Sequence, residues 1–189
     1  MDDGSPLRYL LWILAFLIGS AFFSGAEISY SSVSKIRMTT LADGGDRRAK
    51  RVLVILDSFD RALATLLVGN NIMNIGCATV STVMVTQLWG VGAVGYSTFI
   101  TTAVIFILGE ILPKTFAKTF NEGFAMAISG FTLFLMKLLR PVTFVFAAVG
   151  NFLTKPLRRQ KEEPTVTEDE LIDIIETIVE EGALDEEKG

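Results

Sequence analysis

The sequence contains no histidine and only one cysteine, Cys77, among its 189 residues. Without histidine, the usual zinc sites and the histidine-based forms of acid–base catalysis are disfavoured. A single cysteine cannot form an intrachain disulfide bond. These absences argue against a histidine-dependent enzyme and against a disulfide-stabilised domain.

Charged residues are missing from two long segments, which places the chain among integral membrane proteins. Half of the residues are hydrophobic, and the mean hydropathy is +0.48. Ala62 to Gly109 is uncharged over 48 residues, enough for two membrane helices of about 20 residues each. Tyr9 to Ala26 adds 18 uncharged residues. Because Met1-Asp2-Asp3 lacks the basic start of a secretory signal, this first segment is expected to remain as a membrane helix.

The positive charges predict how three spans are oriented. We expect spans at residues 7–32, 61–87 and 95–112. The loop at 35–51 is rich in Lys and Arg and should be cytoplasmic, because basic loops are retained on that side of the membrane. The N-terminus and the glycine-rich linker at 88–93 then lie outside. The sequence therefore predicts a multi-pass protein of the cell membrane with a cytosolic C-terminus.

A fourth apolar region reads as a hairpin rather than as a span. Lys137, Arg140 and Pro141 divide it into stretches of 14 and 13 uncharged residues, each too short to cross a bilayer. We expect a juxtamembrane helical hairpin, at about 122–158, lying in the inner interface with its cations reaching the headgroups. A conventional fourth span is the alternative, and it would place the C-terminus outside.

The C-terminal part differs in charge from the rest of the chain. Residues 1–166 hold 16 Lys and Arg against 11 Asp and Glu, whereas 167–187 hold ten acidic residues and no basic one. Thr167 and Glu170 form a capping-box pattern at the start of an amphipathic acidic helix. We therefore expect an all-α fold with a transmembrane domain at 1–158. Residues 159–189 are expected to be a linker and a cytosolic helix leading to modules that the sequence does not contain.

Two of the expected spans carry polar side chains on a single face. Ser20 and Ser24 are four residues apart in the first span, and Asn70 and Asn74 are four apart in the second. Asn71 points about 100° away from Asn70 and is expected to serve packing. Taken alone, such a residue would most often make a hydrogen bond between helices.

The third span ends in Gly109-Glu110-Ile111-Leu112-Pro113-Lys114. A carboxylate at this depth, such as that of Glu110, is costly and usually functional. Pro113 lacks the N–H that would bond the Gly109 carbonyl, and a carbonyl left open in a membrane must be satisfied by protein, water or an ion. An ion pair with Lys114 is the alternative role for Glu110. Glu27, in the first span, could pair with Lys35 or face the headgroups.

Hydroxyl, amide, carbonyl and carboxylate oxygens together select hard cations such as Mg²⁺, Ca²⁺ or Na⁺. Their occurrence on three separate helices favours an ion site over three unrelated packing contacts. Gly69, Gly76 and Ala78 further allow helices to approach closely, which supports a homodimer with the second and third spans at its interface.

The same motifs carry a family resemblance. Ser24-Gly25-Ala26-Glu27, Gly69-Asn70-Asn71-Ile72-Met73-Asn74 and the segment 109–114 resemble, in order and spacing, the membrane domain of the CNNM/CorC family of magnesium transporters. The acidic helix resembles the one that precedes a pair of CBS modules in that family. The CBS pair and the CorC-type C-terminal domain do not follow here, so nucleotide regulation is not expected of this piece.

The resemblance implies a homodimer that exports Mg²⁺, coupled to Na⁺ influx. It implies Mg²⁺ ligands at Ser24, Asn70, Glu110 and the Gly109 carbonyl, with Asn74 and Ser20 nearby. The alternative is a membrane-anchored divalent-cation sensor or accessory subunit that does not itself transport. An intramembrane hydrolase built on Ser24 would lack a base at that depth, so we expect no enzyme. The expected partners are membrane lipid, a second copy and the cytosolic CBS modules, with no nucleic acid.

Overall fold

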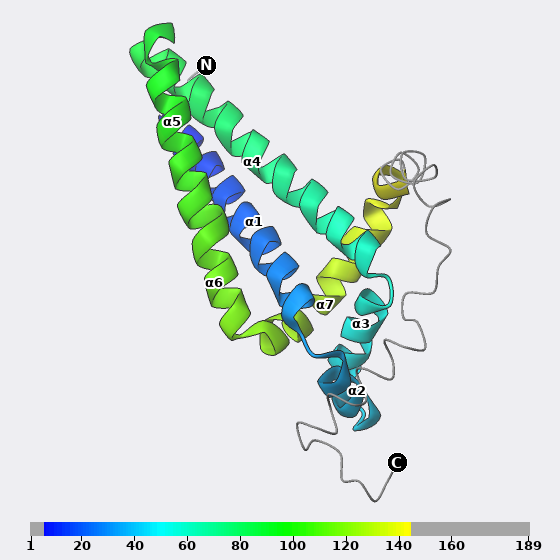
Figure 1. Cartoon of the computed structure of the whole chain (residues 1–189). Coiled ribbons are helices and arrows are strands. Elements are labelled where there is room, and N and C mark those ends of the chain that lie inside the picture. The colour runs from blue at the N-terminus through cyan, green and yellow to red at the C-terminus, as the bar shows by residue number, and fades with distance from the viewer. Residues whose placement is uncertain (1–5, 145–189) are drawn as a thin grey trace, which may run out of the picture. The chain divides into compact units, whose positions relative to one another are not determined.

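The computed structural model describes residues 6–144, and this part of the chain is helical apart from short turns, with no strand (Figure 1). The all-α prediction is confirmed for these residues. The second arm of the expected hairpin beyond residue 144, the linker and the acidic helix lie outside the described residues.

Three helical segments are long and apolar enough to cross a membrane: α1 (Pro6–Ser32), α4 (Phe59–Trp89) and the continuous stretch Val91–Thr119. The last consists of a 3₁₀ turn η1 (Val91–Ala93), α5 (Val94–Val104), η2 (Ile105–Ile111) and α6 (Leu112–Thr119). All three predicted spans are therefore confirmed as apolar helices. The third runs about two turns past its predicted end, because Pro113 lies in the first turn of α6, where proline is tolerated.

The basic segment 35–51, predicted as a loop, is instead mostly helical. It forms α2 (Lys35–Asp43) and the start of α3 (Arg47–Leu56). The Ser34 hydroxyl accepts the Arg37 N–H at the start of α2, and the Asp46 carboxylate accepts the Arg48 N–H at the start of α3. Both helices bury one apolar face and expose their cations. The buried residues are Met38, Ala42, Ala49, Val52 and Ile55.

Helix α1 lies between α4 and the third long helix (Figure 1). Its contact with α4 depends on glycine. A methyl group at Gly69 would collide with the buried ring of Phe23, and one at Gly76 would lie 2.6 Å from the ring of Phe16. The prediction that these glycines allow helices to approach closely is thus confirmed, and the two helices are α1 and α4 of one chain. These two glycines no longer support a homodimer, whereas Ala78 is exposed.

The first arm of the predicted hairpin is helix α7 (Asn121–Leu138), which packs against α1 and α3. The Tyr30 hydroxyl lies 3.0 Å from the Thr132 hydroxyl, and Asn121 donates to the Ser32 carbonyl at 2.8 Å. A turn at Leu139 is followed by helical residues 140–144. Within residues 6–144, α7 is not among the segments that qualify as spans.

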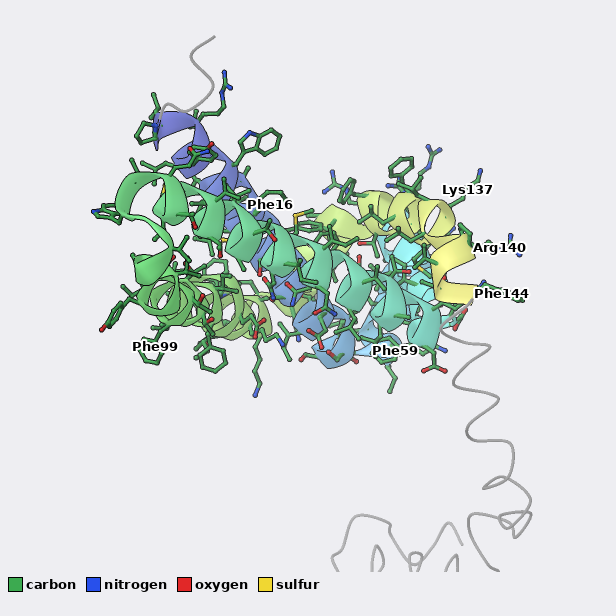
Figure 2. The ribbon with its side chains drawn as sticks, turned by 90° about the horizontal axis from the view of Figure 1, so that it is seen from above. Phe16, Phe59, Phe99, Lys137, Arg140 and Phe144 are labelled. Carbon is green, nitrogen blue, oxygen red and sulfur yellow. The ribbon has the colours of Figure 1, made fainter. Side chains whose placement is uncertain are left out.

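The end of α7 presents cations and apolar groups together on its outside. Lys137, Arg140 and Phe144 project outward from this end of the helices (Figure 2), and all three are exposed. Phe144 is 72% exposed and Phe134 is 58% exposed. This composition suits an interfacial helix; its depth in a membrane stays a prediction.

Candidate cation site

Side chains from α1 and α4 meet at Asn70. The Ser20 hydroxyl lies 3.0 Å from the Asn70 amide oxygen, and the Ser24 hydroxyl lies 3.5 Å from the same oxygen. Ser20 and Ser24 are fully buried, and Asn70 is 9% exposed. The four-residue spacing in the sequence therefore places both hydroxyls on the face of α1 that contacts α4.

The third long helix joins this cluster through its backbone. Ser20 Oγ lies 3.4 Å from the carbonyl oxygen of Gly109, so that one hydroxyl bridges three helices. The approach requires glycine, because a methyl group at residue 109 would lie 2.7 Å from Ser20 Oγ. Gly109 is itself buried.

Gly109 and Glu110 lie in η2, which is a π-helix of seven residues. At its end, the Leu112 N–H bonds the Ile107 carbonyl five residues earlier. From the sequence, an α-helix was expected in which Pro113 leaves the Gly109 carbonyl without a backbone donor. In the structure the helix is already wider, with hydrogen bonds to the fifth residue, before it reaches Pro113. Isolated π segments are rare and often lie at functional sites.

The carboxylate of Glu110 is held by α4. The Asn74 amide nitrogen donates to Glu110 Oε1 at 3.0 Å, and both residues are half-buried. The Asn74 amide oxygen is buried and has no hydrogen-bond partner. A buried acceptor without a partner costs free energy. A hydrogen-bond donor or a cation beside the Asn74 amide oxygen would therefore be stabilising.

The alternative ion pairs proposed from the sequence are replaced by another. Lys114 Nζ lies 3.1 Å from Glu27 Oε2 across the α1–α6 contact. Lys35 instead pairs with Asp57 at 2.8 Å. Sequence reasoning missed the pairing of Glu27 with Lys114, since it depends on how α1 and α6 are placed side by side.

A pocket of about 310 Å³ opens beside Glu110 between α4 and the third helix. Its walls are mostly apolar, and Glu110 contributes its one charge. The lining residues are Asn74, Ile75, Ala78, Thr102, Ile105, Phe106 and Glu110.

The whole of this geometry falls within a segment shared with known proteins. Residues 11–188 match the profile of the CNNM family, described as the Cyclin M transmembrane N-terminal domain. The chain belongs to the CNNM family.

The relatives of this CNNM chain are longer proteins. It is 32% identical to the UPF0053 inner membrane protein YfjD of Escherichia coli over 72% of its own length and 32% of that protein. It is 33% identical to a UPF0053 protein of Haemophilus influenzae over 82% of its length and 36% of the relative. A protein of the same species named polyamine export protein is 26% identical, over 93% of the chain and 44% of the relative. The chain thus spans less than half the length of these relatives.

All six residues predicted from the sequence come together in this CNNM domain as two linked groups. One is Ser20, Ser24, Asn70 and Gly109, and the other is Asn74 with Glu110. The groups adjoin, because Asn74 is one turn from Asn70 and Glu110 follows Gly109. Asn71 is exposed and therefore does not pack within this chain, contrary to expectation. No group of three His, Cys, Asp or Glu occurs among residues 6–144, so neutral oxygens and a single carboxylate make up this donor set.

Proposed function

We propose that this CNNM domain carries Mg²⁺ across the cell membrane and exports it in exchange for Na⁺. The substrate ion is ligated by Ser24, Asn70, Glu110 and the Gly109 carbonyl, with Ser20 and Asn74 completing the shell. The observation that supports the proposal best is the convergence of hydroxyl, amide and carbonyl oxygens from three apolar helices next to one carboxylate. This is oxygen chemistry suited to a hard cation.

The spacing of the oxygens is compatible with Mg²⁺. Neighbouring ligands of an octahedral Mg²⁺ with bonds of about 2.1 Å are about 3.0 Å apart. The oxygens of Ser20 and Asn70 are already 3.0 Å apart. The other two pairs, at 3.4 and 3.5 Å, need to close by only a few tenths of an ångström. The Ser20 and Ser24 hydroxyls donate to Asn70 and Gly109 oxygens here, and their protons would have to rotate away so that the oxygen lone pairs face the ion.

Glu110 supplies the charge that makes the site selective for cations. The serines, Asn70 and the Gly109 carbonyl are neutral, so the carboxylate is the strongest electrostatic contribution to ion binding. Its neighbour Asn74 fixes its orientation, and a group held in place loses less conformational freedom when the ion arrives. The same oxygen set can accept Na⁺ in turn, which is what an exchange mechanism needs.

Two other functions remain as alternatives. The complete burial of Ser20 and Ser24 suits a sensor or accessory subunit, in which the bound ion does not move on. The apolar pocket beside Glu110 would suit an organic polycation, whose methylene chain could lie along Ile75 and Phe106 with an ammonium at the carboxylate. A relative named polyamine export protein makes this second substrate class worth testing.

The test is Mg²⁺ flux in proteoliposomes that contain the 189-residue chain, with an imposed Na⁺ gradient. We expect Glu110→Ala to abolish Mg²⁺ binding and flux, and Ser24→Ala and Asn70→Ala to weaken both. Glu110→Gln keeps the shape and one oxygen, so it isolates the contribution of charge. Asn71→Ala, on an exposed position of the same helix, is the matched control.

Each alternative has its own outcome in this assay. Binding without flux would favour the sensor, and putrescine flux that Mg²⁺ does not inhibit would favour the organic cation. Wild-type affinity and flux in Glu110→Ala would exclude the proposed site.

A further inference from the structure

An ion pair lies one helical turn away from the candidate cation site on two helices at once. Glu27 follows Ser24 by three residues on α1, and Lys114 follows Glu110 by four on the third helix. Residues with these spacings lie on the same helix face, one above the other. The pair of Glu27 with Lys114, at 3.1 Å, therefore lies directly beyond the site toward the ends of α1 and α6.

The pair is more accessible than the site behind it. Each of its side chains is 38% exposed, whereas Ser20 and Ser24 are fully buried. Helix α1 leads into the basic helices α2 and α3, and Arg37 of α2 pairs with Glu122, which follows α6. The distribution of charge marks these basic helices as cytoplasmic. A cation moving from that side toward Glu110 would meet the Glu27 carboxylate first.

The pair contributes little to holding the helices together. Ion pairs that are exposed to solvent contribute little to stability. Helices α1 and α6 already contact each other at Gly25, where an added methyl group would lie 3.5 Å from Ala117 Cβ. Opening the pair would therefore cost little and would leave this packing in place.

We propose that Glu27 and Lys114 form the cytosolic gate of the cation path. The inference rests on the proposed function. While the pair is closed, the Lys114 ammonium is bound to the Glu27 carboxylate. It also repels cations from Glu110, which lies one turn away. An arriving Mg²⁺ carries twice the charge of the ammonium and displaces it from Glu27, after which the ion passes to Glu110. A monovalent cation competes less well for the carboxylate, so the closed pair limits leakage of such ions.

The first test compares Lys114→Gln with Lys35→Gln, which breaks an ion pair of similar length in the helices after α1. Vesicles without Mg²⁺ report leakage of monovalent cations, and calorimetry in detergent reports Mg²⁺ binding. We expect leakage through Lys114→Gln to rise about tenfold, as a barrier lowered by about 1.4 kcal/mol produces, with Mg²⁺ binding retained. Lys35→Gln should match the wild type. The exchange Glu27→Lys with Lys114→Glu restores the pair and should reduce the leakage again.

The second test closes the gate covalently. Glu27→Cys and Lys114→Cys, combined with Cys77→Ser, would be bridged by a short reducible bis-methanethiosulfonate linker. We expect Mg²⁺ flux to stop when the linker is added and to return when it is reduced. If the pair only held the helices together, the bridged protein would still transport.

The two proposals fail in different ways. If the wild type transports Mg²⁺ but Lys114→Gln does not leak, or if the bridged protein transports normally, the gate is wrong and the site stands. If the wild type neither binds nor transports Mg²⁺, the proposed function fails and the gate falls with it.

Discussion

Asn74 holds the Glu110 carboxylate with its amide nitrogen at 3.0 Å, while its own amide oxygen is buried without a partner. The side chain thus orients the only carboxylate among the six predicted site residues and offers an oxygen that nothing else in the described chain satisfies. Both features suit a residue next to a bound cation.

We expect Asn74→Ala to weaken Mg²⁺ binding by about tenfold, since a hydrogen bond to a charged group contributes about 1.5–3 kcal/mol and water can replace part of it. The loss should be smaller than that of Glu110→Ala, because the charge remains. Calorimetric titration of the purified variants measures it. Affinity equal to that of the exposed Asn71→Ala variant would show that Asn74 has no part in the site.

Gly109→Ala tests the contact between the third helix and α1. The new methyl group would lie 2.7 Å from Ser20 Oγ and would push that hydroxyl out of the cluster. We expect Mg²⁺ affinity to fall while the chain remains folded. Gly95→Ala is the control, because it adds a methyl group to α5 in open space. If the two variants bind Mg²⁺ equally well, the close approach at Gly109 is unimportant for the ion.

Gly76→Ala tests how α1 packs on α4. The methyl group would lie 2.6 Å from the Phe16 ring, and overpacking of this kind costs about 1–3 kcal/mol. We expect a lower midpoint of thermal unfolding in detergent than for Gly95→Ala. Shortening the opposing side chain with Phe16→Leu should recover part of the loss in a double-mutant cycle. Strictly additive effects would mean that the two residues do not compete for the same space.

The orientation of the spans can be tested by labelling single cysteines in a Cys77→Ser background. We expect Asp3→Cys to react with a membrane-impermeant maleimide from outside, and Arg47→Cys and Glu162→Cys only from the cytosol. The basis is the cation-rich segment that includes α3. Outside labelling at residue 162 would require a fourth span.

The homodimer is tested by native mass measurement in detergent. With Gly69 and Gly76 occupied by α1, we expect a twofold contact through exposed faces of α4 and α5, which include the small residue Ala78. A monomer alone at micromolar concentration would contradict it.

Sequence reasoning located the spans well, because the length of an uncharged segment is set by the thickness of the bilayer and needs no knowledge of tertiary contacts. It also grouped Ser20 with Ser24 and Asn70 with Asn74, since helical spacing alone determines which side chains share a face. Helices α2 and α3 were missed, although Ser34 and Asp46 precede them as ordinary N-cap residues. The many cations in both segments obscure the short apolar faces by which these helices pack.

Other features could not be read from the sequence. The pairing of Glu27 with Lys114 and the fit of Gly69 against Phe23 depend on which helices become neighbours. The π-helix is likewise a result of tertiary contacts. Gly109 and Pro113 indicated a departure from α-helical hydrogen bonding, but they did not indicate a π-helix.

The π-helix also changes what a gain or loss of one residue would mean in the third span. In a regular α-helix, deleting one residue shortens the helix by about 1.5 Å and turns everything beyond it by about 100°. The π segment holds a residue in excess, so a deletion between Ile105 and Leu108 would let it rewind as an α-helix while α5 and α6 keep their relative orientation. The wide turn that brings the Gly109 carbonyl to Ser20 would be lost, although the helices on either side would stay in register. A one-residue deletion here therefore changes only the local backbone at the ligands, whereas a deletion elsewhere in the span misaligns its two ends.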